Sequence, residues 1–239
     1  MIDTYEKLNT TLTQVDYIVH LSDVHIRLTQ RHQEYRGVFS KVYEQIKNTP
    51  PNTVVVNTGD TFHSKCDLSP EAVQLASEFL KNCADIRPTI IIPGNHDCLL
   101  TNVTRLDSIS PVVDNLAHKN LYYLKESKLY SFANLLFNNM SIFEDHTSFI
   151  KMKNVSKKIK TEFDIKIALY HGGVFDAKTD IGYNITNRNV TTETFDGHDI
   201  ALLGDIHMAQ NMYIEKYVDE NELEDYIKSG EWEIVEENP

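Results

Sequence analysis

The sequence has few of the features that mark secreted, membrane-spanning or repetitive proteins. It contains three cysteines in 239 residues, and Cys66, Cys83 and Cys98 are odd in number and lack C-x-x-C spacing. Such thiols fit a reducing compartment better than a disulfide framework. The first 15 residues are polar and no apolar run is long enough to span a bilayer. We therefore expect an intracellular protein, in the cytoplasm or nucleoid, with no membrane partner.

Positive charge is also scarce. The formal net charge is −12, of which the acidic segment 214–239 carries −8 and the remaining residues −4. This balance argues mildly against a nucleic-acid substrate, because contacts to phosphate need Lys and Arg. One local basic run stands out and either touches a DNA backbone or is a solvated helix face. Its members are Lys151, Lys153, Lys157, Lys158 and Lys160.

Apolar runs rich in β-branched residues alternate with amphipathic segments, which predicts a layered α/β fold. Two segments have apolar residues at helical spacing, one from Val38 to Ile46 and one from Ala72 to Leu80, with Pro70 in the first turn of the latter. Less regular apolar pieces between 121 and 143 suggest a second group of strands. The buried strands are predicted at 17–21, 53–56, 89–92, 165–170 and 200–203.

Polar motifs follow these strands, at the carboxyl ends where open α/β sheets place their sites. They are Ser22-Asp23-Val24-His25, Asn57-Thr58-Gly59-Asp60, Pro93-Gly94-Asn95-His96-Asp97, Tyr170-His171-Gly172-Gly173 and Gly204-Asp205-Ile206-His207. Taken singly, each is more often a turn or a capped helix start than a metal site. Carboxylate, imidazole and amide ligands without thiolates favour Mn²⁺, with Fe²⁺, Zn²⁺ or Mg²⁺ as alternatives.

All five motifs together, in this order, resemble the calcineurin-like metallophosphoesterase superfamily, whose pattern is DxH, GD, GNH(D/E), H and GHxH. The resemblance spans Tyr17 to His207 and implies a four-layer α/β fold, with a central β-sandwich flanked by helices. It also implies two divalent metal ions. One would be held by Asp23, His25, Asp60 and His207, and the other by Asp60, Asn95, His171 and Asp205. Asp205 is a departure, since the family usually has His there.

The segment after the second motif, Gly59-Asp60-Thr61-Phe62-His63-Ser64, is similar to the GDxFHxx segment of SbcD-type double-strand-break-repair nuclease subunits. That branch has phage and viral members, so the host cytoplasm is a further possible location. The phosphatase form of this motif, GDxVDRG, is absent. The branch implies DNA as substrate, a coiled-coil ABC-type ATPase subunit of the SbcC kind as partner, and a homodimer.

The resemblance implies phosphodiester hydrolysis by in-line attack of a metal-bound hydroxide. His96 would be the general acid that protonates the leaving oxygen. His63 either positions the scissile strand or is a surface histidine, Asp97 is expected to support its loop by hydrogen bonds, and Phe62 to pack in the core.

Two other functions stay open: hydrolysis of small phosphoesters, and a non-catalytic binding subunit whose second metal site is impaired by Asp205. We expect a catalytic domain over 1–213 and an acidic segment over 214–239. Within that segment, Trp232 lies in a possible strand, and 219–228 is either a polar helix or a partly disordered tail. The DNA-capping domain of SbcD-type proteins is expected to be absent, as in a catalytic core, a minimal form or a shortened chain.

Overall fold

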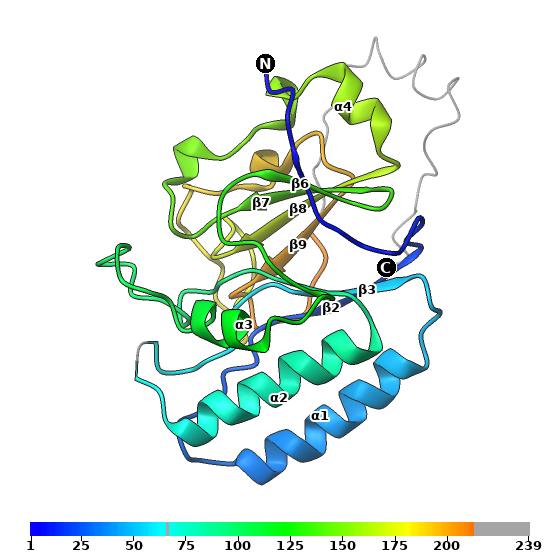
Figure 1. Cartoon of the computed structure of the whole chain (residues 1–239). Helices are drawn as coiled ribbons and strands as arrows, with labels where there is room; N and C mark the ends of the chain where they lie inside the picture. Colours follow the sequence, from blue (N-terminus) through cyan, green and yellow to red (C-terminus); the bar gives the residue numbers. More distant parts are fainter. Residues whose placement is uncertain (66, 213–239) are drawn as a thin grey trace, which may run out of the picture.

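The computed structural model describes residues 1–65 and 67–212, whose strands form two sheets (Figure 1). The first sheet is fully parallel, and in the second only the β6–β7 pair is antiparallel. The first contains, in spatial order, β2 (Tyr17–Leu21), β3 (Thr53–Asn57), β4 (Thr89–Ile91) and β5 (Leu121–Tyr123). The second contains β1 (Glu6–Lys7), β6 (Leu129–Phe132), β7 (Leu135–Met140), β8 (Ile165–His171) and β9 (Ile200–Gly204).

The two sheets pack face to face because their strands carry apolar side chains on the facing sides, and successive side chains of a strand point to opposite faces. Val54 and Val56 of β3 share a buried cluster with Phe137 and Ile167 of the second sheet. Val55, which points to the other face of β3, lies in a separate cluster under the helices. This alternation places one hydrophobic core between the sheets and another between the first sheet and its helices.

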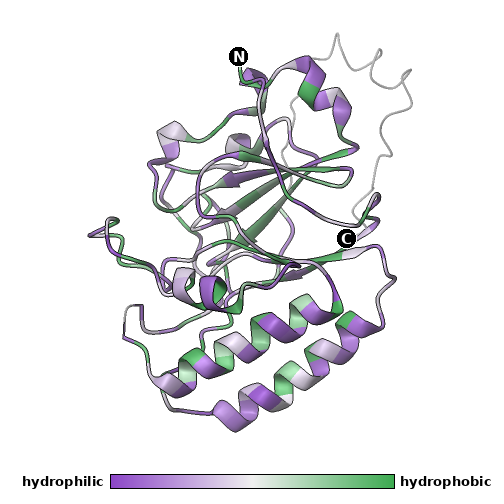
Figure 2. Cartoon of the chain, in the orientation of Figure 1, coloured by the Kyte–Doolittle hydropathy of each residue, from purple (hydrophilic) through white to green (hydrophobic). Residues whose placement is uncertain are grey.

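Helices cover the outer faces and complete four layers (Figure 1). They are α1 (His32–Lys47), α2 (Pro70–Ile86) and α3 (Ser110–Leu116) on the first sheet, and the short α4 (Lys157–Glu162) on the second. Figure 2 shows α1 and α2 with mixed hydrophilic and hydrophobic residues, as expected for amphipathic helices. The predicted α/β sandwich flanked by helices is confirmed.

Both predicted helices are present, and α2 begins as expected, with Pro70 in its first turn and the Ser69 hydroxyl accepting from the Ala72 N–H at 3.0 Å. Two details of α1 differ. The helix starts at His32, six residues before Val38, because Arg31 at its N-cap adopts a left-handed conformation (φ 63°). Val38, expected in the core, is 56% exposed, and Phe39 is buried instead.

The second group of strands, predicted between 121 and 143, is present but divided, since β5 joins the first sheet while β6 and β7 join the second. Cys83 and Cys98 are buried, and no disulfide joins the described cysteines. None of the described helices has the length and apolarity needed to cross a membrane. The predictions for Cys66, for the boundary at 213, for 219–228 and for a strand around Trp232 lie outside the described residues.

Candidate metal centre

The predicted site residues meet at one edge of the sandwich, where the parallel strands end. The loops after β2, β3 and β4 carry the first three motifs, His171 is the last residue of β8, and the fifth motif follows β9. Hydrogen bonds join the two sheets here: the Asp205 N–H donates to the Asp23 carboxylate, and His171 Nδ1 lies 2.7 Å from the Thr58 carbonyl oxygen. Residues more than 100 positions apart thereby share one site.

Asp60 lies at the centre of this group and is fully buried. Its Oδ1 atom is 3.3 Å from His171 Nε2, and its Oδ2 atom is 3.5 Å from His25 Nε2. Ligand atoms of Asp23, Asp60 and His171 all lie within 4.8 Å of one another. A carboxylate whose two oxygens each lie near a different imidazole can bridge two cations.

A second group of candidate ligands lies nearer the solvent. Asp23, His25 and His207 also offer atoms within 4.8 Å of one another, and the Nε2 atoms of the two histidines are 3.4 Å apart. Burial lowers the pKa of His25, although the charges of Asp60 and Asp23 oppose this shift. The ring is therefore neutral near pH 7, as a metal ligand must be.

Several buried polar atoms at the centre have no hydrogen-bond partner in the described part of the chain. They include Asp60 Oδ2, Asn95 Oδ1 and His171 Nε2. A buried polar atom left unpaired costs about 1–3 kcal/mol, so three in one place need an explanation. All three are good ligands of a hard or borderline divalent cation. The residues present therefore fit the two divalent ions that the motifs predict.

The hydrogen bond to Thr58 fixes how His171 presents its ring. Because Nδ1–H donates to the Thr58 carbonyl, Nε2 faces Asp60. Burial lowers the pKa of His171, but the negative charge of Asp60, whose Oδ1 lies 3.3 Å from Nε2, outweighs burial and raises the pKa to about 9. Without an ion, Asp60 thus holds a proton on His171, and an incoming cation must displace that proton.

Asp205 points into the site despite its departure from the family pattern. Its Oδ1 atom lies 3.9 Å from His171 Nε2 and accepts a hydrogen bond from Asn95 Nδ2 at 3.1 Å. That bond orients the Asn95 amide and leaves its oxygen unpaired. Asp205 and Asn95 therefore lie beside His171, and their role as metal ligands stays a prediction.

The backbone at the site is unusually constrained. Asp23, His25, Asp60 and Asp205 all have positive φ angles, between 50° and 72°. A Cβ atom on Gly94 would overlap both the carboxylate and the backbone nitrogen of Asp60, so only glycine fits where the third motif passes the second.

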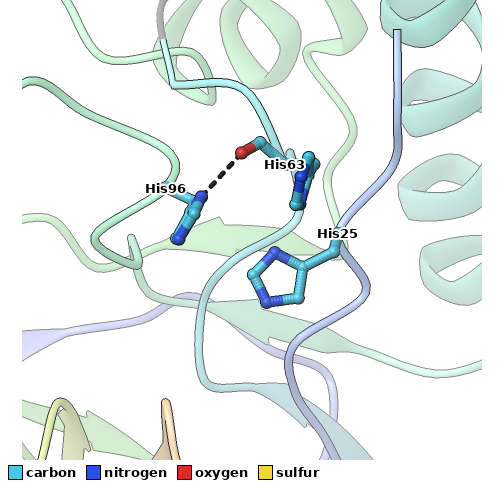
Figure 3. A group of neighbouring side chains, drawn as sticks. All are labelled: His25, His63 and His96. Carbon is cyan, nitrogen blue, oxygen red and sulfur yellow. Dashed lines mark hydrogen bonds between the residues drawn. The ribbon is translucent and has the colours of Figure 1, made fainter. Parts of the chain in front are cut away.

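His96 stands beside the candidate ligands, at the rim of the site (Figure 3). Its Nδ1–H donates to the His63 carbonyl oxygen at 2.6 Å, which leaves Nε2 to face a substrate. The His63 ring stacks on His96 with centroids 5.6 Å apart, and His25 meets His96 edge to face at 4.9 Å. The three imidazoles also lie close enough to share an ion. Sequence placed His63 and His96 near the metals, and the structure brings them together.

Asp97 is a buried clamp, as expected from the sequence. Its carboxylate accepts hydrogen bonds from the backbone N–H groups of Thr61, Phe62 and Gly94, at 2.8–3.2 Å. Burial raises the pKa of Asp97 to about 7, while these N–H donors lower it. The clamp ties the second motif to the third, and Phe62 is a core residue as predicted.

The basic run lies elsewhere. Lys157, Lys158 and Lys160 are on α4, which precedes β8, whereas His171 is at the far end of that seven-residue strand. At about 3.3 Å per residue this is a separation of roughly 20 Å.

The sequence did not reveal two cations at the rim of the site, Lys65 and Arg105. Nothing in the sequence indicates that their loops meet at His96. Sequence reasoning also missed the positioning role of the Thr58 carbonyl, which a sequence pattern cannot reveal.

Comparison with known proteins agrees with this geometry. A family model described as calcineurin-like phosphoesterase matches residues 17–235. A protein of Acanthamoeba polyphaga mimivirus, described as uncharacterized protein R555, is 44% identical over 217 residues. The alignment covers 87% of this chain but 16% of the viral protein, so the chain spans a small part of that relative. Because the family model covers most of the sequence, this chain belongs to the calcineurin-like phosphoesterase family, whose members hydrolyse phosphoesters with two divalent metal ions.

Proposed function

We propose that this phosphoesterase is a nuclease that hydrolyses phosphodiester bonds in DNA, as the exo/endonuclease subunit of a recombination or repair complex. The single observation that carries the proposal is the pairing of His63 with His96 at the rim. Neither imidazole belongs to the two predicted sets of metal ligands, and together they extend the site beyond one phosphoryl group, which suits a diester with substituents on both sides.

Some residues of the site would hold the metal ions, and His96 transfers a proton. Two divalent ions, when bound, polarise the phosphoryl group and supply a nucleophile at neutral pH. Mn²⁺ suits the oxygen-rich donor set around Asp60 best. His96 protonates the leaving oxygen from Nε2, because its Nδ1–H is engaged by the His63 carbonyl. Asp97 keeps the loops of Asp60 and Asn95 in register through its backbone contacts.

Protein partners form the second part of the proposal. Leu100, Val103 and Leu106 are exposed on the loop after the third motif, and exposed apolar side chains at one place favour a protein contact. We propose a homodimer near this loop and a coiled-coil ABC-type ATPase of the SbcC kind as partner. Sedimentation of the chain alone and with such an ATPase tests both.

An intracellular location, in the host cytoplasm for a virus-encoded protein, stays a prediction that cell fractionation tests.

A divalent-metal assay separates the candidate functions. The protein is freed of metal with a chelator, reloaded with Mn²⁺, and incubated with single-stranded DNA or with bis-p-nitrophenyl phosphate. We expect cleavage of both, two ions per chain by elemental analysis, and loss of most DNA cleavage in His96→Asn with its ions retained. His198→Gln is the matched control, since that histidine lies outside the site.

Three results would contradict the proposal. Hydrolysis of the small diester with no DNA cleavage favours a small-phosphoester substrate. One ion per chain without turnover favours a binding subunit whose second site Asp205 has impaired. Near-normal DNA cleavage by His96→Asn removes His96 from its role as the acid.

A further inference from the structure

Cations without an ion-pair partner in the described part of the chain lie beside His63 and His96, at the rim of the site. Lys65 and Arg105, together with His63 and His96, line a pocket of about 500 Å³. Arg27 is close by, since its positive charge adds to the effect of burial in lowering the pKa of His63. The lining contains none of the predicted metal ligands, and His96 joins the pocket to the metal centre, because its backbone N–H donates to Asp60 Oδ1 at 2.8 Å.

These cations lack the partners that other cations of the chain have. Within the described residues, Lys65, Arg105 and Arg27 form no ion pair, whereas Lys125 and Lys166, for example, lie 2.7 and 2.9 Å from carboxylates. The pocket lining includes the acidic Asp67, which forms no ion pair with either cation within the described range. In a chain of net charge −12, uncompensated cations beside a phosphoryl site create a local attraction for anions.

The two loops that carry the cations are fixed to each other. The Ser108 hydroxyl donates to the Lys65 carbonyl oxygen at 2.5 Å, and the Ser108 N–H donates to the Asp97 carbonyl oxygen at 2.7 Å. Lys65 itself adopts a left-handed conformation (φ 53°). These bonds hold the Lys65 and Arg105 loops against the third motif, so less order has to be created when an anion binds.

The position of His96 tells which part of a substrate enters the pocket. His96 protonates the leaving oxygen, so the leaving group extends from the metal centre past His96 into the space lined by Lys65 and Arg105. We propose that this pocket binds a second phosphate, carried by the leaving group of the substrate. The inference rests on the proposed phosphodiesterase function and narrows its substrate to polynucleotide-like chains with consecutive phosphates.

Dinucleotides test this directly. Mn²⁺-loaded protein is given thymidine dinucleotide with no terminal phosphate, with a 5′ phosphate, or with a 3′ phosphate, and kcat/KM is measured for each. We expect one phosphorylated dinucleotide, the one whose extra phosphate is on the leaving group, to be cleaved about tenfold faster than the unphosphorylated one, as a charge-assisted contact predicts. In Lys65→Gln and Arg105→Gln that ratio should fall toward one.

Lys119→Gln is the matched control, because Lys119 is an exposed lysine next to the start of β5, at the opposite end of the first sheet from the site. It should keep the wild-type ratio. Equal rates for all three dinucleotides, or an unchanged ratio in both pocket variants, would overturn the inference while leaving phosphodiester hydrolysis in place. Failure of the wild type to hydrolyse even bis-p-nitrophenyl phosphate would overturn the proposed function, and this inference with it.

Discussion

Asp97→Asn tests how the second and third motif loops are held together. Oδ1 of Asp97 accepts from the Phe62 N–H at 2.8 Å, while Oδ2 accepts from the N–H groups of Thr61 at 3.2 Å and Gly94 at 2.9 Å. The amide of asparagine keeps one acceptor but places an NH₂ group where the other acceptor was. When the amide oxygen replaces Oδ2, it still accepts from Thr61 and Gly94, and only the buried Phe62 N–H loses its acceptor, so we expect the free energy of unfolding to fall by about 1–3 kcal/mol. That is a large share of the roughly 5–15 kcal/mol that stabilises a typical protein.

Urea unfolding followed by circular dichroism measures this change. It is done without metal and at pH 8, above the pKa of about 7 that burial gives Asp97. Asp145→Asn is the control, because it makes the same chemical change on an exposed side chain that accepts from the Thr147 N–H at 2.9 Å. Asparagine caps as well as aspartate, so the control should change stability by less than about 0.5 kcal/mol. Calorimetric Mn²⁺ binding is measured on both variants.

Two results would refute this reasoning. If Asp97→Asn unfolds within about 0.5 kcal/mol of the wild type, the carboxylate does not hold the loops. If the variant is destabilised but binds Mn²⁺ as tightly as the wild type, the clamp stabilises the fold without positioning Asp60 and Asn95.

Three further predictions concern packing, pH and metal. Gly94→Ala should lower the free energy of unfolding by about 1–3 kcal/mol and weaken Mn²⁺ binding, because the added Cβ atom overlaps Asp60. The control is Gly37→Ala, whose Cβ atom meets open space on α1. It should raise the free energy of unfolding by about 0.5–1 kcal/mol in the same urea titration. Burial lowers the pKa of His198 below its usual 6.5, so the unfolded chain takes up the proton first and stability should fall as pH drops below 6.5. A His198→Gln variant should lose this slope, and an unchanged slope would assign it to another group. Metal affinity should rise about tenfold per pH unit up to about pH 9, because the metal must displace the proton of His171, whose pKa is about 9. Calorimetry in buffers of different ionisation enthalpy detects the released proton. An affinity that does not change with pH would mean that His171 is neutral before metal binds.

The strands and their motifs could be predicted because one local pattern carries both kinds of information. In β3 a buried apolar run is followed by Thr58, Gly59 and Asp60, so the same residues mark the strand and the edge where it ends. Parallel strands end at a common edge, which is enough to bring Asp60 and Asn95 together without further knowledge.

Features that depend on a neighbouring element could not be predicted. Val38 and Phe39 are adjacent, and the helical spacing suggested Val38 as the buried one. Phe39 is buried because α1 packs against α2, where its ring lies 4.3 Å from that of Phe79, and the sequence of one helix does not reveal the direction of its partner. The pocket also depends on a neighbouring element, since Lys65 and Arg105 are 40 residues apart in the sequence and line the same pocket, where Ser108 donates to the Lys65 carbonyl oxygen.

The site is built from features that each destabilise the metal-free chain. Asp23, His25, Asp60 and Asp205 hold left-handed backbone conformations, which cost on the order of 1 kcal/mol each for residues other than glycine. Three of the four are also carboxylates that repel one another, and buried atoms around them lack hydrogen-bond partners within the described chain. The Asp97 clamp offsets part of this cost through the backbone, but it supplies no positive charge. Protonated His171 supplies one positive charge against three carboxylates, and divalent ions would supply more, so metal binding should contribute to the stability of the fold as well as to catalysis.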